Sequence, residues 1–297
     1  VPGVPMRYFM GIDAGGTSCR ARLVDAAGRV LGTGRTGTAN LRIGAEAASA
    51  RILAAAGEAL AMAGLDPSAL AETTAGLGIA GISRAGARGA QAAQRLRFRD
   101  LAIVGDARIA LLGAHGGRDG AIVIIGTGSI GLAQVDGREI TVGGHGFPVS
   151  DGGSGADIGL AAIRQALLAH DGCGPESPLT ATVLDRLGGT PTGVIAWMDQ
   201  ATATEYATLA PMVVEHAARG DGVGASILTA AAAQIAVMVR VLIARGAPCC
   251  ALIGGLAGSL APWLPPDIPP LLAPAESDPL DGALILARRQ HAASPSP

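Results

Sequence analysis

The predicted order of secondary structure indicates an α/β protein built from two similar halves. Strands and helices alternate as far as residue 114, which is typical of α/β folds. At Gly120 the order restarts, because an apolar strand is again followed by a glycine turn and a hairpin. The 45 glycines gather where apolar strands end, and this placement gives the first indication of a ligand site.

In the first half, the predicted order of elements is three strands, a helix, a strand, a helix, a strand and a helix. Residues 25–28 form a turn with glycine, so the strands on either side make a hairpin. An Ala-rich amphipathic stretch without proline forms the first helix, which Gly64 ends. The expected elements are 7–12, 19–24, 29–36, 45–63, 74–80, a helix through Ala92 and Leu96, 101–104 and 107–114.

The second half is expected to open with a strongly apolar strand and a hairpin around Asp136 and Gly137, followed mainly by helices. Residues 262–279 hold several prolines and no periodicity, which predicts a surface loop. The expected elements are 120–125, 130–134, 139–142, 154–169, helices from Leu179, Thr208 and Ala225, 249–253 and 281–289.

Composition excludes several classes of protein. The net charge is −2, so no basic field exists to hold nucleic acid or an anionic membrane. Residues 225–244 are apolar, but Gln234 and Arg240 interrupt them, which favours a buried core helix. No secretory signal is visible, and we expect a cytoplasmic protein. We expect neither disulfides nor zinc, and small buried side chains at Cys19, Cys173, Cys249 and Cys250.

Three glycine turns follow apolar strands, at 13–17, 126–129 and 254–258. Glycine permits φ above zero and lets backbone N–H groups approach an anion. Each turn alone could be an ordinary loop, but three together favour phosphate binding. The chain has no P-loop lysine motif, so Mg²⁺ has to neutralise the phosphates. The candidate phosphate ligands are Asp13, Gly15, Gly16, Thr17, Gly126, Thr127, Gly128, Ser129, Gly254 and Gly255.

Carboxylates stand beside these turns. Asp13 ends a buried strand and could hold Mg²⁺ or its waters; the alternative is a turn cap. Asp106 ends another strand and could accept a hydroxyl proton; the alternative is a helix N-cap. Asp151 lies in the glycine-rich loop 143–155 and could bind sugar hydroxyls or an ammonium group, or stabilise the next helix. His145 could contact substrate or be a surface residue, and Asp157 suits the helix dipole.

Residues 11–17 resemble the first phosphate motif of the superfamily of sugar kinases, chaperone ATPases and actin. Residues 126–129 resemble its second phosphate motif, and residues 253–255 its adenosine motif. More narrowly, the chain resembles the BadF/BadG/BcrA/BcrD-type ATPase family, which contains N-acetylglucosamine kinases and bacterial glucosamine kinases. That resemblance rests on Asn40, 105–107, the loop 143–155 and 279–283.

The resemblance implies two ribonuclease-H-like (actin-like ATPase) domains, with ATP in the cleft between them. The N-terminal domain would span 6–110 and include a C-terminal helix at 281–291, and the other domain would span 111–280. Family analogy also suggests a homodimer.

The resemblance further implies ATP and Mg²⁺ as cofactors and an amino sugar as substrate. Asp106 would be the base that activates the 6-hydroxyl, and the other sugar contacts would come from Asn40, Gly144, His145 and Asp151. Residues 147–151 look most like the glucosamine kinase branch, with N-acetylglucosamine as the alternative acceptor.

Two departures from the family pattern lie beside the expected sugar site. His145 stands where such kinases commonly have Trp, and Gly152 stands where Glu usually follows the Asp. Two other classes stay open: an ATPase activator that shares an iron–sulfur cluster, and a sugar sensor without catalysis. Cysteines in or beside a buried strand speak against the first, and intact Asp13, Thr17, Asp106 and Thr127 against the second.

Overall fold

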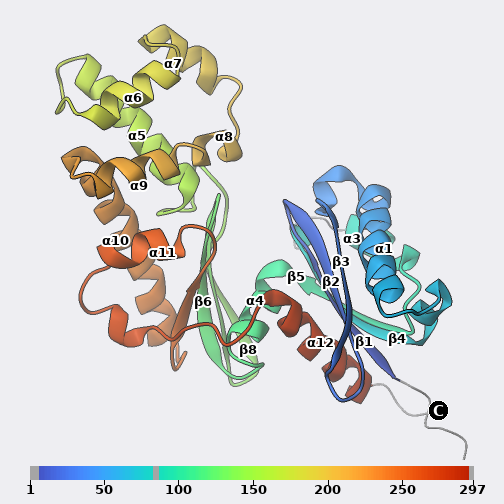
Figure 1. Cartoon of the computed structure of the whole chain (residues 1–297). Helices are drawn as coiled ribbons and strands as arrows, with labels where there is room; N and C mark the ends of the chain where they lie inside the picture. Colours follow the sequence, from blue (N-terminus) through green and yellow to red (C-terminus); the bar gives the residue numbers. More distant parts are fainter. Residues whose placement is uncertain (1–6, 83–86, 294–297) are drawn as a thin grey trace, which may run out of the picture. The chain divides into compact units, whose positions relative to one another are not determined.

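The computed structural model describes residues 7–82 and 87–293. They fall into two compact units (Figure 1). Unit 1 is drawn from Val1–Arg118 and Ala275–Pro297, and unit 2 is Asp119–Pro274. The chain therefore leaves unit 1 once and returns to it with its last helix.

Unit 1 is a five-stranded sheet in the order β3-β2-β1-β4-β5. Strands β1, β4 and β5 are mutually parallel, and β2 and β3 continue β1 as an antiparallel meander. The parallel strands therefore end at one edge of the sheet. The strands are β1 Tyr8–Ala14, β2 Ser18–Val24, β3 Val30–Gly37, β4 Thr73–Ile79 and β5 Asp100–Gly105; the helices are α1 Ala45–Met62, α3 Ala87–Arg95, α4 Asp106–Ala114 and α12 Pro279–Ala293, with 3-10 turns at Leu41–Ile43 and Pro67–Glu72.

Glycine lets α12 lie almost on the backbone of the sheet. A Cβ at Gly76 of β4 would stand 2.0 Å from the carbonyl oxygen of Ala283 in α12. A Cβ at Gly11 of β1 would stand 2.4 Å from the carbonyl oxygen of Leu280. On its other side α12 meets α4 in the same way, since a Cβ at Gly282 would stand 1.8 Å from the Ile109 carbonyl oxygen.

Unit 2 repeats the first four strands of unit 1 in a sheet of order β8-β7-β6-β9. An antiparallel meander is again followed by a strand parallel to its first member. The strands are β6 Gly120–Ile125, β7 Ser129–Val135, β8 Arg138–Gly143 and β9 Cys250–Ile253; the helices are α5 Gly155–His170, α6 Pro178–Arg186, α7 Pro191–Met198, α8 Ala203–Ala207, α9 Ala210–Ala218, α10 Gly222–Ala244 and α11 Ala257–Leu260, with 3-10 turns at Ala261–Trp263 and Pro269–Leu271.

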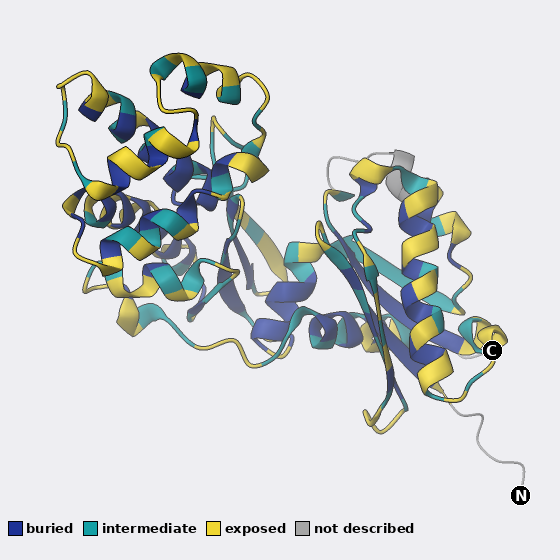
Figure 2. Ribbon diagram, turned by 45° about the horizontal axis from the view of Figure 1, so that its top comes forward, coloured by how far each residue is buried: buried dark blue, intermediate teal, exposed yellow. Residues whose placement is uncertain are grey.

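Helix α10 is long and apolar enough to cross a membrane, by length and composition, and half of the tested window is buried inside the unit. Its inward residues, including Ile235 and Val239, join the main core cluster of unit 2. Buried residues follow the strands and one side of the helices (Figure 2). The predicted core helix over residues 225–244 is therefore confirmed as a helix with a buried face.

The predicted element order of both halves is confirmed, with ends shifted by one or two residues for most elements. Three short helices, α7, α8 and α11, were not predicted, because each spans about two turns or fewer and shows little periodicity. The stretch 262–279 is not only a surface loop, since Ile268 is fully buried in the core of unit 2. Cys173 is exposed rather than buried, because it lies in the turn after α5.

We expect Gly282→Ala to lower the free energy of unfolding by about 1–3 kcal/mol, the usual cost of overpacking. The clash would be with backbone, which a side-chain rotation cannot relieve. Denaturant unfolding measures the change. Gly57→Ala in α1 is the matched control, because no atom lies within 4 Å of its Cβ position. That control should gain about 0.5–1 kcal/mol; equal behaviour of the two variants would contradict the close packing.

Candidate functional site

The residues predicted from the sequence form two groups, one in each unit. In unit 1 the carboxyl ends of β1, β4 and β5 place Asp13 and Asp106 at the same edge of the sheet. In unit 2 the carboxyl ends of the parallel strands β6 and β9 do the same for the turns 126–129 and 254–255. This is the edge at which open α/β sheets bind ligands.

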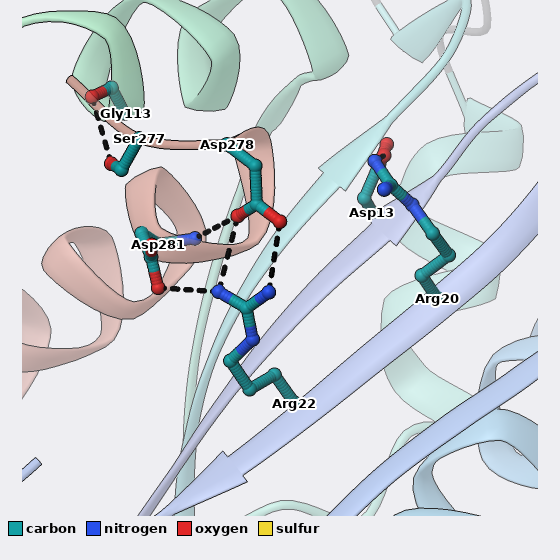
Figure 3. Close-up of polar contacts among 7 residues, drawn as sticks. All are labelled: Asp13, Arg20, Arg22, Gly113, Ser277, Asp278 and Asp281. Atoms are coloured by element: carbon teal, nitrogen blue, oxygen red, sulfur yellow. Dashed lines mark hydrogen bonds and ion pairs between the residues drawn. The ribbon is translucent and has the colours of Figure 1, made fainter. Parts of the chain in front are cut away.

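Asp13 is the last but one residue of β1 and is largely buried. Its Oδ2 accepts a hydrogen bond from Nη2 of Arg20 on β2 at 2.6 Å. Figure 3 shows the ends of the two side chains close together. Register pairs the two residues directly across the antiparallel strands. Arg20 was not singled out from the sequence, although an arginine two residues from another arginine in a strand does signal one charged face.

Asp106 follows β5 and opens α4, so Gly105, not Asp106, is the N-cap. The carboxylate accepts the N–H of Ala107 at 3.0 Å and is still exposed to solvent. Surrounding protein removes part of its water, and this desolvation raises the pKa of Asp106; the negative charge of Asp13 raises it further. A carboxyl with a raised pKa is a better proton acceptor.

The turn after β1 is held from the side by Asn40. Hydroxyl Oγ1 of Thr38 donates to the Gly15 carbonyl at 3.3 Å, and Nδ2 of Asn40 donates to that hydroxyl at 3.1 Å. Oδ1 of Asn40 accepts from the N–H of Arg42 and so caps a 3-10 turn. Gly16 and Thr17 remain exposed at the tip. The structure thus brings Asn40 beside the first predicted phosphate turn.

A second arginine on β2 binds the start of α12. Arg22 donates to both carboxylate oxygens of Asp278, at 3.1 and 2.8 Å, and to Asp281 at 2.5 Å (Figure 3). Burial opposes ionisation of Asp278, but the Asp281 N–H and the Arg22 guanidinium outweigh it and lower the pKa of Asp278. Ser277 adds a hydrogen bond to the Gly113 carbonyl at 2.9 Å. This cluster was not predicted, since Arg22 and Asp278 are 256 residues apart.

In unit 2 the second and third glycine turns meet. The Leu256 N–H donates to the Ile125 carbonyl at 3.1 Å. A Cβ at Gly254 would stand 2.4 Å from the same carbonyl oxygen, and its φ of 101° suits glycine. Thr127 is exposed at the tip of its turn, whose carbonyls also accept the first N–H groups of α5.

Asp151 lies against the second glycine turn. Its Oδ2 stands 2.5 Å from the position that a Cβ on Gly128 would take. Its Oδ1 accepts the N–H of Gly146 at 3.1 Å, so the carboxylate closes the loop across its base. His145 is exposed, and its N–H donates to Oγ of Ser150 at 3.4 Å. The structure places Asp151 beside the turn and leaves the imidazole of His145 at the surface.

Ser129 differs from expectation. Its side chain is buried, and its hydroxyl donates to the carbonyl of Gly152 at 2.9 Å. This hydroxyl therefore links the glycine-rich loop to β7, and the role of Ser129 as a phosphate ligand stays a prediction. Asp157 serves the helix start as expected, but it also accepts from the Gly153 N–H and from Gln234.

Aromatic side chains brace the other side of the loop. Phe147 of the loop packs on Tyr206 of α8, with ring centroids 5.0 Å apart. Tyr206 packs in turn on Trp197 of α7 at 5.0 Å. Three of the chain's seven Phe, Tyr and Trp residues thus support one loop. Helices α7 and α8, neither of which was predicted from the sequence, supply Trp197 and Tyr206.

The residues present can fit Mg²⁺ only together with a phosphate ligand. Across residues 7–82 and 87–293 no group of three or more His, Cys, Asp or Glu could hold a metal. Asp13 offers one carboxylate, and Arg20 is paired with it. Magnesium in kinases usually takes one or two carboxylates and fills its octahedron with phosphate oxygens and water. Asp13 can supply one such carboxylate, but it cannot form a magnesium site from protein ligands alone.

The chain is similar to several proteins named as kinases of amino sugars. The glucosamine kinase GspK of Vibrio cholerae is 37% identical over 282 residues, covering 95% of this chain and 96% of its own. An N-acetylmuramic acid/N-acetylglucosamine kinase of Clostridium acetobutylicum is 32% identical, covering 80% of each chain. A crystal structure from Chromobacterium violaceum, proposed to be an N-acetylglucosamine kinase, superimposes with a TM-score of 0.86 at 36% identity, covering 95% and 99%.

The resemblance noted from the sequence is confirmed by a family comparison. The pattern of the BadF/BadG/BcrA/BcrD ATPase family matches residues 10–264, which is most of the chain. The expected α/β fold with two sheets is that of the sugar kinase structure above. The chain belongs to the BadF/BadG/BcrA/BcrD ATPase family.

Proposed function

We propose that this protein is an ATP-dependent hexosamine kinase that transfers the γ-phosphoryl group to the 6-hydroxyl of glucosamine. The observation that carries the proposal is 37% identity to a glucosamine kinase over 95% of the chain. The position of Asp106 supports it, because a carboxyl with a raised pKa stands at the ligand-binding edge of a parallel sheet.

Asp106 would act as the general base. As the sugar oxygen attacks the γ-phosphorus, the bond to the β,γ-bridging oxygen breaks and the hydroxyl proton passes to the carboxylate. A positioned base of this kind contributes about 10²–10⁴-fold to the rate. The free solvent-facing side of Asp106 leaves room for a hydroxyl.

The glycine turns would hold the phosphates and adenosine. Gly15, Gly16 and Thr17 in unit 1, and Gly126, Thr127 and Gly128 in unit 2, would offer backbone N–H groups and hydroxyls. Gly254 and Gly255 would lie along the adenosine. Asp13 would bind Mg²⁺ through water, and that ion would supply charge neutralisation of the phosphates when bound.

The sugar would be bound by Asn40, Gly144, His145 and Asp151. Asp151 is the candidate partner of the glucosamine ammonium group, because it is a carboxylate beside the phosphate turn of unit 2. N-acetylglucosamine is the second candidate acceptor. It is favoured by 32% identity to a kinase named for N-acetylmuramic acid and N-acetylglucosamine.

The activator reading has less support. A shared iron–sulfur cluster needs accessible cysteine thiolates. Burial raises the pKa of Cys250 to about 12, and burial likewise raises that of Cys19 to about 12. Two of the four cysteines are therefore poor cluster ligands.

The proposal also covers the organisation of the chain. We take the two units as the two ribonuclease-H-like domains. The boundaries expected at 110/111 and 280/281 shift to 118/119 and 274/275, because all of α4 and the chain before α12 belong to unit 1. The reaction would take place in the cytoplasm, where ATP is available. The homodimer stays a prediction, and light scattering tests it.

We expect ATP- and Mg²⁺-dependent turnover on glucosamine in a panel that includes N-acetylglucosamine, N-acetylmannosamine, glucose and a no-sugar blank. Phosphorylation of the acetylated sugar alone would move the assignment to the second candidate. ATP hydrolysis that ignores every sugar would remove the kinase assignment.

Asp106→Asn should lower kcat by about 10²–10⁴-fold and leave the KM for ATP nearly unchanged, because only the proton acceptor is lost. Steady-state kinetics with glucosamine measure both constants. Asp100→Asn is the matched control, since Asp100 begins the same strand at its opposite end and accepts from Thr74. Near wild-type turnover of Asp106→Asn would withdraw the base role.

The pH profile should report the same carboxyl. A base acts when it is ionised, so turnover is lost as pH falls through its pKa. Because the pKa of Asp106 is raised, that loss should begin at a higher pH than for an ordinary aspartate. Measuring kcat at saturating substrates locates the acidic limb. A limb in the ordinary aspartate range, or the same limb in Asp106→Asn, would contradict the assignment.

A further inference from the structure

The loop after β8 rests at both ends on helix α10. A Cβ at Gly143 would meet Sδ of Met238 at 3.4 Å. A Cβ at Gly153 would stand 2.6 Å from the carbonyl oxygen of Ala231, and Gly153 has a φ of 76°. The loop between these glycines contains Asp151. The loop that carries Asp151, the residue proposed to bind the sugar, therefore packs on helix α10.

Gln234, on this helix, is linked to the end of the loop through one carboxylate oxygen of Asp157. Its Nε2 donates to Oδ2 of Asp157 at 3.0 Å. The same oxygen accepts the N–H of Gly153 at 2.9 Å. A movement of the Gln234 side chain would therefore displace Asp157 and weaken its hydrogen bond to Gly153, which is two residues from Asp151.

The same amide lies over Gly152. A Cβ at Gly152 would stand 1.9 Å from Oε1 of Gln234 and 2.9 Å from its Cδ. On its other side the Gly152 carbonyl accepts the hydroxyl of Ser129 at 2.9 Å. The turn is thus held between β7 and α10, and Gln234 occupies the space in which a side chain at position 152 would begin.

Asp151 needs such support because its backbone is strained. Its φ is 66°, in the left-handed region that non-glycine residues seldom adopt. Such conformations persist where the surroundings over-determine them, and they cluster at ligand sites. The Ser154 N–H donates to the Asp151 carbonyl at 3.1 Å, and Gln234 and Ser129 hold the residues between.

We propose that Gln234 is a positioning residue for the acceptor sugar, acting through Gly152 and Gly153 to hold Asp151 in its left-handed conformation. The inference rests on the proposed function, in which Asp151 binds the amino sugar. It assigns to Gln234 an effect on the affinity for the sugar, with little effect on ATP or on the phosphoryl transfer step.

The test is a double-mutant cycle on Gln234→Ala and Gly152→Ala. Loss of one hydrogen bond should raise the KM for glucosamine roughly three- to tenfold. The KM for ATP and kcat should stay within about twofold, as for lost ground-state binding. Gly152→Ala should show the same pattern, because its methyl group displaces the Gln234 amide from Asp157. The KM of the double variant for glucosamine should be no higher than that of either single variant, because both substitutions remove the same contact between Gln234 and Asp157.

Arg240→Ala provides the control on the same helix. Arg240 pairs with Asp267 at 2.7 and 2.8 Å, away from the loop, so its loss should leave the KM for glucosamine unchanged. Thermal melting of each variant reports the fold. Gln234 is exposed, so its truncation removes atoms without opening the core.

A wild-type KM for glucosamine in Gln234→Ala would overturn the inference, as would a parallel rise in the KM for ATP. Independent, additive effects of the two substitutions would also overturn the coupling. A wild-type enzyme that phosphorylates no sugar would instead remove the proposed function and the inference with it. The wild-type assay thus separates the two failures.

Discussion

The close contact of α12 with the sheet of unit 1 is the constraint on which the rest of that unit depends. Gly11 and Gly76 on the strands, and Gly113 and Gly282 between the helices, remove side chains wherever backbones meet. Because α4 is pressed against α12, the strand that leads into α4 is fixed as well. The edge that presents Asp13 and Asp106 is therefore set by backbone packing, and larger side chains elsewhere fill the remaining core.

Charge is balanced at this edge in two ways. Asp13 is paired with Arg20, whereas Asp106 forms no ion pair within residues 7–82 and 87–293 and has a raised pKa. Arg22 is committed to Asp278 and Asp281, which anchors the return of the chain. The two carboxylates at this edge thus differ: one is paired with a guanidinium, and the other has a raised pKa.

Local patterns sufficed for much of this protein. Glycine turns and alternating strands predicted the element order, and the apolar runs before Asp13 and Asp106 predicted that both carboxylates lie at strand ends. Contacts between distant residues could not be predicted. Three features depend on tertiary packing and leave no periodic signal in the sequence. They are the pairing of Arg22 with Asp278, the burial of Ile268 and the contact of Gln234 with Gly152.

The return of the chain to unit 1 also has a consequence for biosynthesis. Unit 2 is one continuous segment, Asp119–Pro274, so its whole sequence has been polymerised before synthesis of α12 begins. Until then the glycine face of β1 and β4 lacks its covering helix. Chains are synthesised from the N-terminus at about 5–20 residues per second, and domains generally fold as units. The unit whose synthesis begins first is thus the last to have its whole sequence made, and it cannot be completed until the end of the chain is available.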